Sequence, residues 1–225
     1  GNEKLLSKYI EILNKSDIDA ITVQVIKKDF FIKNKIPKFY IEKQKLYNLI
    51  FNQCKKKIGL IVDEIDENIY KFKKKINFFK ILGDQVNDKN LLKNLVSFKK
   101  LIYVSNKNKN NTEKKYLNFL SKKNKLINII HTQDKNKTEL KHAKLNNILN
   151  IHKITKKKPA FGLHCNDTEL LKYALMFKPK DIFFYIKDNN PNYKYPDNLH
   201  AISLKNLDKI ISEIVYISNS MKDWK

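Results

Sequence analysis

Two hydrophobic periods alternate along this chain. Short runs of consecutive apolar residues, such as 182–186, are typical of strands that are covered on both faces. Between these runs, apolar residues recur at helical spacing, as in 5–13. The predicted strands are 20–26, 59–62, 78–82, 101–104, 126–130, 160–163 and 182–186. The predicted helices are 5–13, 42–55, 67–72, 88–96, 112–120, 139–149, 167–177 and 204–217, with Thr112 as the N-cap of the fifth.

The alternation of strands and helices predicts an α/β fold with a parallel sheet. Seven strands are predicted, and the series opens on a helix where a strand would be expected. One more strand would give the eight that close a barrel. We therefore expect a parallel (β/α)8-type TIM barrel that lacks its first strand. No linker or internal repeat interrupts the pattern, so residues 1–225 are expected to form a single domain.

Composition narrows the class of protein further. Hydrophobic residues make up 42% of the chain, yet the longest apolar runs have strand length, so no membrane span is expected. No signal-peptide pattern opens the sequence, and two cysteines cannot build a disulfide framework, which favours a cytoplasmic protein. Only four glycines are present, and none belongs to a Walker or dinucleotide-binding motif.

The formal net charge of +23 raises the question of nucleic-acid binding. Every basic residue is a lysine, however, whereas arginine is the usual residue for bidentate contacts to phosphate and guanine. We favour lysines on solvated faces, and nucleic acid is the less favoured partner. Attraction of acidic small molecules or of membranes is a further alternative.

Candidate chemistry is expected where the strands end, because parallel β/α folds bind ligands there. His131 follows one strand, where it could bind a metal, act as an acid or base, or simply hold a hydrogen bond. His164 follows the next strand, so the pair could share a metal. Lys80 lies inside an apolar strand, where it would bind an anion or form a Schiff base, unless it reaches outward to water. The remaining histidines are expected at the surface: His142, His152 and His200.

Six segments, in order along nearly the whole chain, resemble the sialic acid synthase family. Residues 20–24 (AITVQ) are similar to its strand ending in Lys-Phe-Gln, and 79–92 to its Phe-Lys-Ile-Ala-Ser-Gly-Asp stretch. Residues 129–131 (IIH) resemble its Leu-Leu-His metal-ligand strand. The other three segments are 161–167, similar to Gly-Tyr-Ser-Asp-His-Thr, 174–187, similar to the strand with Glu-Lys-His, and 195–204, similar to Pro-Asp-His…Ser-Leu.

The resemblance implies a barrel that condenses phosphoenolpyruvate with an N-acetylated amino sugar. A divalent metal, manganese or magnesium, would polarise the sugar aldehyde. By resemblance, His131 is a metal ligand, with His164 as a second ligand, and Lys80 holds the phosphoenolpyruvate anion. The other substrate-binding positions that the resemblance implies are Gln24, Ser105, which would fall on the phosphate-binding turn, and Asn166.

Several positions depart from the family pattern. Asn166 stands where the second metal histidine belongs, and Asp63 would repel a phosphate. The remaining departures are Thr22 for a lysine, Gly83 for a serine, Val62 beside Asp63 for a Ser-Thr pair, and Phe183 and Tyr185 for a glutamate and a histidine. The C-terminal antifreeze-like domain of many members has no counterpart in these residues.

These departures lead to three hypotheses. The first is a sialic acid synthase-like protein of sugar-acid biosynthesis with altered or lost activity, so whether it is an active transferase stays open. The second is a non-catalytic binding or scaffold barrel that forms a homodimer or pairs with an active paralogue. The third is a lysine-rich nucleic-acid binder, whose affinity would fall steeply with salt.

Overall fold

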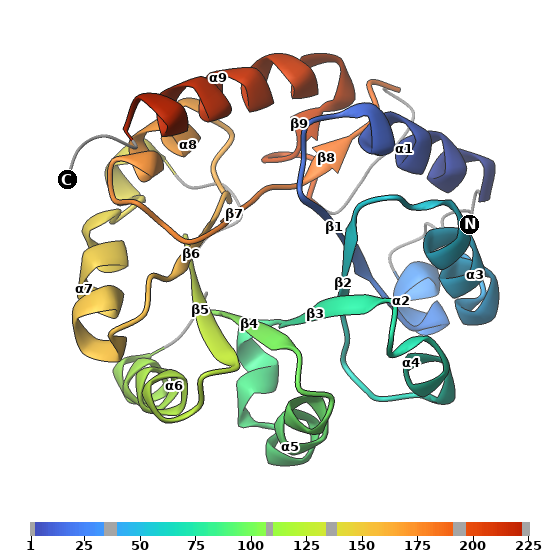
Figure 1. Ribbon diagram of the computed structural model, residues 1–225, viewed down its shortest axis with the longest axis horizontal. Coiled ribbons are helices and arrows are strands. Elements are labelled where there is room, and N and C mark those ends of the chain that lie inside the picture. The colour runs from blue at the N-terminus through green and yellow to red at the C-terminus, as the bar shows by residue number, and fades with distance from the viewer. Residues whose placement is uncertain (1–2, 34–39, 107–109, 134–138, 191–196, 222–225) are drawn as a thin grey trace. The chain divides into compact units, whose positions relative to one another are not determined.

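The computed structural model describes residues 3–33, 40–106, 110–133, 139–190 and 197–221 (Figure 1). Its strands are β1 (Ala20–Gln24), β2 (Lys57–Ile61), β3 (Ile76–Ile81), β4 (Leu101–Ser105), β5 (Ile127–Thr132), β6 (Ala160–Gly162), β7 (Ile182–Phe183), β8 (Ile186–Lys187) and β9 (Ile202–Ser203). Its α-helices are α1 (Glu3–Lys15), α2 (Lys28–Lys33), α3 (Lys43–Gln53), α4 (Glu67–Phe72), α5 (Lys89–Ser97), α6 (Asn111–Lys123), α7 (Asn146–Thr155), α8 (Glu169–Leu175) and α9 (Leu207–Ser220). Three short 3₁₀ turns are η2 (Gly83–Asn87), η3 (Leu140–His142) and η4 (Leu204–Asn206).

Strands β1 to β7 belong to one sheet and follow one another in the order of the chain. The pairs β1–β2, β2–β3, β5–β6 and β6–β7 are parallel, and helices connect successive strands. A second, two-stranded parallel sheet consists of β8 and β9. Each strand therefore pairs with its neighbour in sequence, which is the connectivity of a β/α barrel.

The chain divides into two compact units. Unit 1 comprises residues 1–81 and 85–102, and unit 2 comprises residues 82–84 and 103–225. Strand β4 contributes its first two residues to unit 1 and its last three to unit 2. Two compact units do not decide between one domain and two, so the single domain over residues 1–225 stays a prediction.

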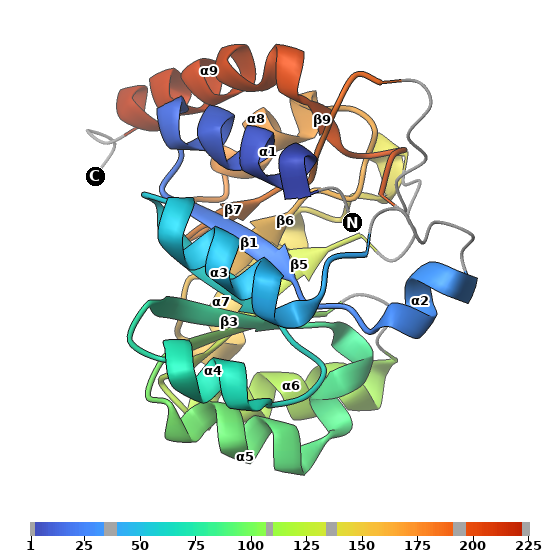
Figure 2. The same ribbon diagram turned by 90° about the vertical axis from the view of Figure 1, so that its right-hand side faces the viewer.

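In unit 1, aromatic rings from two helices pack behind the strands. Tyr47 and Phe51 of α3 stack with Phe72 of α4, and the Phe51 and Phe72 ring centroids lie 4.7 Å apart. Helices α1 and α3 lie side by side (Figure 2), and the Asn14 side chain donates a hydrogen bond to the Gln53 carbonyl oxygen at 2.9 Å. This packing fixes the position of α3, whose first residue is Lys43.

In unit 2, the core lies between β6 and the helices that follow it. Phe161 and Leu163 are fully buried beside Leu171 of α8 and Ile202 of β9. Helix α8 packs against α9, and α6 packs against α7. Every helix that the described ranges contain is too short or too polar to cross a bilayer.

Two predicted elements are wrong in detail. The pattern predicts a helix over 139–149, whereas the structure has η3, then Lys144 in the left-handed region (φ 49°), then α7. The single strand predicted over 182–186 is split into β7 and β8, because the backbone changes partner within it. Phe183 accepts a hydrogen bond from the Leu163 amide at 2.8 Å, whereas Tyr185 accepts one from the Ile202 amide at 2.7 Å.

Helix α6 begins with a reciprocal capping box, and its N-cap is Asn110 instead of the predicted Thr112. The Asn110 side chain accepts from the Glu113 amide at 2.9 Å, and the Glu113 carboxylate accepts from the Asn110 amide at 3.0 Å. Both hydrogen bonds satisfy amides that the first helical turn leaves without a backbone partner. The sequence signal was present, because Asn110 and Glu113 have the spacing of a capping box.

Replacing Asn110 with alanine should lower the free energy of unfolding by about 1 kcal/mol, because the first amides of α6 lose their cap. Urea denaturation of the wild type and the variant measures the change. Asn111→Ala is the matched control, since Asn111 is exposed inside the first turn. Equal losses in the two variants would contradict a specific role for the capping box.

Candidate functional site

In unit 2, buried polar side chains line the carboxyl ends of β4 and β5. The hydroxyl oxygens of Ser105 and Thr132 lie 3.2 Å apart, and both residues are buried. The Asn106 side chain accepts a hydrogen bond from the Thr132 amide at 3.0 Å, and the Asn106 amide donates to the Ile130 carbonyl at 3.1 Å. Ser105 therefore lies at a strand end, as predicted, within a network that joins two strand ends.

Gln133 extends this polar row beyond β5. Its side-chain oxygen accepts a hydrogen bond from the His164 amide at 2.6 Å, which fixes the orientation of the amide group. Gln133 is 2% exposed, and its Nε2 has no hydrogen-bond partner within the described residues. A buried NH₂ group held in this way is a ready donor for an acceptor oxygen. The sequence analysis did not identify Gln133, because a glutamine that follows the strand with His131 belongs to no recognisable binding motif.

His131 lies inside β5, not after it, and is 2% exposed. Its Nε2 lies 3.0 Å from the Ala143 carbonyl oxygen. Because a carbonyl oxygen can only accept, Nε2 carries the proton and donates it. The ring also packs near Phe161, at 6.3 Å between centroids. His131 thus ties β5 to the segment that precedes α7.

The residues expected to bind a metal belong to β5 and to the segment that follows β6. The Nε2 of His131 donates to the Ala143 carbonyl, which leaves Nδ1 as the ring nitrogen with a lone pair, and Asn166, in the place of the second histidine, is exposed. Over the described ranges, no group of three or more histidine, cysteine, aspartate or glutamate side chains is placed to hold a metal ion. The manganese or magnesium ion that the resemblance implies stays a prediction.

His164 belongs instead to a cluster of rings, the imidazole cluster, made of His164, His200 and Tyr185. The two imidazoles stack at 4.7 Å between centroids with an interplanar angle of 19°. The Tyr185 ring stands edge-on to both, at 5.4 Å from His164 and 5.0 Å from His200. The His200 Nε2 lies 3.3 Å from a carboxylate oxygen of Asp197. Burial raises the pKa of Tyr185, so its hydroxyl stays protonated.

The expected surface position of His200 is wrong: the residue is 2% exposed, because its ring is covered by His164 and Tyr185. His142 and His152 are exposed, as predicted. The sequence places His200 in a polar segment rich in asparagine and proline, and no local period indicates that the ring turns inward.

Phe183, in the place of the expected glutamate, also contacts an aromatic ring. It meets Tyr103 of β4 edge-on at 5.0 Å between centroids. The Tyr103 hydroxyl donates a short hydrogen bond to the Asp181 carboxylate. Burial, together with this carboxylate, raises the pKa of Tyr103 and keeps it a donor. The end of β7 thus places an aromatic ring, that of Phe183, against Tyr103 of β4.

In unit 1, Lys80 is 5% exposed within β3, where its Cα pairs with that of Ile61. This burial excludes a lysine that reaches outward into bulk water. Gln24 is the last residue of β1 and is exposed. Gln24 lies at the end of its strand and Lys80 inside its strand, as predicted, and their contacts with a substrate stay predictions.

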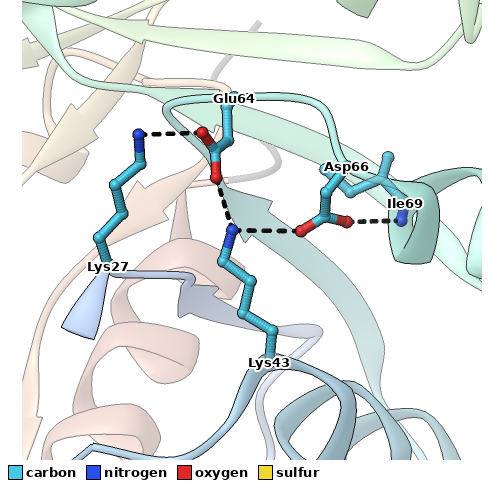
Figure 3. A network of polar contacts seen from close by, with 5 residues as sticks. All are labelled: Lys27, Lys43, Glu64, Asp66 and Ile69. Carbon is cyan, nitrogen blue, oxygen red and sulfur yellow. Dashed lines mark hydrogen bonds and ion pairs between the residues drawn. The ribbon is translucent and has the colours of Figure 1, made fainter.

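A network of ion pairs occupies the loops that follow β1 and β2 (Figure 3). The Glu64 carboxylate contacts Lys27 at 2.9 Å through one oxygen and Lys43 at 2.6 Å through the other. Lys43 also lies 3.4 Å from Asp66, whose second oxygen caps α4 by accepting from the Ile69 amide at 3.1 Å. The hydrogen bonds from Lys43 and Lys27 lower the pKa of Glu64, which keeps it ionised.

Comparison with known proteins supports the fold. No family model and no curated protein matches the sequence. Among solved structures, the N-acetylneuraminic acid (sialic acid) synthetase of Leptospira borgpetersenii, in complex with citrate, has a TM-score of 0.82 at 16% identity, over 100% of this chain and 82% of that one. The spore coat polysaccharide biosynthesis protein SpsE of Bacillus subtilis has a TM-score of 0.79 at 17% identity, over 100% of this chain and 66% of that one.

A truncated 3-deoxy-D-arabino-heptulosonate 7-phosphate synthase from Thermotoga maritima is also similar, with a TM-score of 0.74 at 11% identity over 98% of this chain and 83% of that one. Similarity at this level of identity shows the fold. The described residues have the β/α barrel-type fold of these solved structures, with seven strands in the main sheet, which confirms the expected fold class. This chain spans about two thirds of the length of the Bacillus protein.

Proposed function

We propose that this chain is a divergent sialic acid synthase-like protein of sugar-acid biosynthesis whose condensation of phosphoenolpyruvate with an N-acetylated amino sugar is lost or altered. The observation that carries the proposal is the imidazole cluster at the ends of β6 and β7, together with the fold shared with the Leptospira synthetase. Tyr185 packs where the resemblance implies a histidine, and His164, which it implies as a second metal ligand, stacks on His200.

The chemistry of the expected reaction explains why this packing matters. Adding an enol carbon to an aldehyde requires the aldehyde oxygen to be polarised, which the family is expected to achieve with a metal. Asn166 is a weaker metal ligand than the histidine it replaces. Phe183 provides no carboxylate. Losing several such groups together abolishes activity, because site residues act as a unit.

A second candidate is a barrel that binds a ligand without turning it over. The observations that favour it are the buried Nε2 of Gln133 and the buried pair of Ser105 and Thr132 hydroxyls at two strand ends. These groups would suit a ligand with carboxylate, phosphate or hydroxyl oxygens. Pairing as a homodimer or with an active paralogue, and the less favoured binding of nucleic acid, stay predictions.

Incubating the protein with phosphoenolpyruvate, N-acetylmannosamine and manganese should release no phosphate above a reaction without protein. A sialic acid synthase under identical conditions serves as the positive control. Turnover comparable with this control, and lost on His131→Ala, would contradict the loss of the reaction. Calorimetry of phosphoenolpyruvate in the absence of metal then separates the candidates, since binding without phosphate release supports the second.

A further inference from the structure

Lysines gather at the amino ends of three successive strands in unit 2. They belong to the segments that precede β5, β6 and β7, here called the lysine edge: residues 122–125, 156–158 and 178–181. These segments hold eight lysines and one acidic residue, Asp181. Between residues 103 and 221, the other described segments hold nine lysines and eight acidic residues, so their charges nearly cancel. The excess positive charge of unit 2 is therefore concentrated at one edge of the sheet.

Hydrogen bonds show that the three segments are neighbours. The Lys157 ammonium donates to the Asn124 carbonyl at 2.7 Å, which joins the first segment to the second. The Lys180 amide donates to the Pro159 carbonyl at 2.8 Å, which joins the second to the third. Strand β6 is parallel to both β5 and β7, and helices α6, α7 and α8 follow one another around the sheet (Figure 1). The lysine edge is thus one continuous surface.

The charges of the lysine edge are not neutralised by ion pairs. The exposed lysines of the edge that form no ion pair within the described ranges are Lys122, Lys123, Lys125, Lys156, Lys158 and Lys180. The Asp181 carboxylate accepts a hydrogen bond from the Tyr103 hydroxyl. Burial lowers the pKa of Lys157, and the charge of Lys180 lowers it further. The ammonium groups therefore repel one another, and a partner with many negative charges would relieve this repulsion.

An exposed apolar side chain precedes each of the three segments. Phe119 of α6, Ile154 of α7 and Met176 at the end of α8 are 49–69% exposed. Each lies two or three residues before the first lysine of its segment. A bilayer surface suits both kinds of group, because anionic headgroups attract ammonium groups while apolar side chains enter the boundary beneath the headgroups. Nucleic acid suits the surface less well, since the chain has no arginine to contact bases.

We propose that the lysine edge of unit 2 is a docking surface for a bilayer that contains anionic lipids, with Phe119, Ile154 and Met176 entering the headgroup region. Binding of this kind lies in the plane of the surface and requires no spanning helix. The carboxyl edge of the same strands, where β/α folds bind their ligands, then points away from the bilayer. The proposal goes beyond the proposed function and uses none of the residues on which that function rests.

Sedimentation of the protein with lipid vesicles tests the docking surface. We expect binding to vesicles that contain phosphatidylglycerol and none to vesicles of phosphatidylcholine alone. The double variant Lys122→Gln, Lys123→Gln should bind the anionic vesicles about 25-fold more weakly, because each lysine near an anionic surface contributes about fivefold to the affinity. The double variant Lys158→Gln, Lys180→Gln, which changes the other two segments, should show a similar loss.

Lys114→Gln, Lys115→Gln is the matched control, because both lysines lie near the start of α6, whereas Lys122 and Lys123 lie at its end. At physiological salt, charges beyond about 8 Å are largely screened, so this variant should bind the anionic vesicles nearly as well as the wild type. Equal losses in this variant and in Lys122→Gln, Lys123→Gln would reduce the binding to net charge and overturn the proposal. Equal binding to both kinds of vesicle, or binding to neither, would also overturn it.

Phe119→Gln, Met176→Gln distinguishes a bilayer from nucleic acid. This variant keeps every lysine but loses two of the apolar side chains, so it should bind the anionic vesicles more weakly than the wild type. Unchanged vesicle binding would overturn the proposal, as would a duplex oligonucleotide that displaces the wild type from the vesicles at an equal concentration of phosphate groups. Thermal unfolding of each variant verifies that it is folded.

Discussion

Replacing Lys157 with methionine should lower the free energy of unfolding by about 2–4 kcal/mol, since hydrogen bonds from charged groups contribute about 1.5–3 kcal/mol each. The Lys157 ammonium donates to three backbone carbonyls, those of Ser121, Asn124 at 2.7 Å and Ile127 at 2.8 Å. These carbonyls belong to the end of α6 and the start of β5. Methionine keeps the length of the side chain but leaves all three acceptors without this donor.

The local backbone explains how Lys157 reaches this place. Lys156 ends α7 in the left-handed conformation (φ 60°), which turns the chain back toward β5. The Thr155 hydroxyl, which donates to the Ile151 carbonyl at 2.7 Å, accepts from the Lys157 amide at 3.2 Å. A positive charge at the C-terminal end of α6 also interacts favourably with the helix dipole. One lysine thus caps a helix that lies far from it in sequence.

Urea denaturation of Lys157→Met and of its neighbour Lys158→Met measures this effect. Both changes remove one positive charge, but Lys158 is exposed. We expect the free energy of unfolding of Lys158→Met to be about that of the wild type, because isolated surface charges contribute little to stability. Equal midpoints for the two variants would show that the three hydrogen bonds contribute nothing beyond net charge.

Lys157 also illustrates what the sequence can and cannot specify. Apolar runs predict the strands correctly from β1 to β6, because that pattern follows from burial of each strand's own faces. In the run 156–158, the same reasoning predicts only a solvated turn, since three consecutive lysines look alike. Which of them turns inward depends on carbonyls 30 to 36 residues away, and no local pattern contains that information.

The candidate site shows the same division. Ser105 could be placed at a strand end and Lys80 inside a strand from the sequence, because an apolar run and its end are visible. His200 could not, because its burial depends on stacking with His164 across a change of sheet. The resemblance identified which positions belong to the site but not which contacts their side chains make. It gives Tyr185 as the replacement of a histidine, whereas the structure shows that the Tyr185 ring packs against the His164 and His200 rings.

Gly59 in β2 is required by its cross-strand neighbour Phe78 in β3. The two Cα atoms are register partners, next to a register shift between Ile58 and Gly59. A Cβ at position 59 would lie 2.2 Å from Cε2 and 2.3 Å from Cζ of the Phe78 ring. Carbon atoms that are not bonded to each other do not approach so closely, so the Phe78 ring or the backbone would have to move. Phe78 is buried, so the ring can move only by displacing its neighbours.

Gly59→Ala should therefore lower the free energy of unfolding by about 1–3 kcal/mol through overpacking. Phe78→Leu should also destabilise the protein, because it leaves space in the core. The double variant should be less destabilised than the sum of the two, with a coupling of about 0.5–3 kcal/mol, since leucine leaves room for the new methyl group. Urea denaturation of the four proteins measures the cycle.

Additive losses would mean that the alanine at position 59 is accommodated without touching the ring. A coupling between the two substitutions would show that the contact of the Phe78 ring with Gly59 helps to hold β2 and β3 in register. Lys80 lies two residues beyond Phe78 on the same strand, and its Cα pairs with that of Ile61 in this register. Because side chains alternate along a strand, Phe78 and Lys80 share one face of the sheet. The packing that requires a glycine at position 59 therefore also fixes the face to which Lys80 belongs.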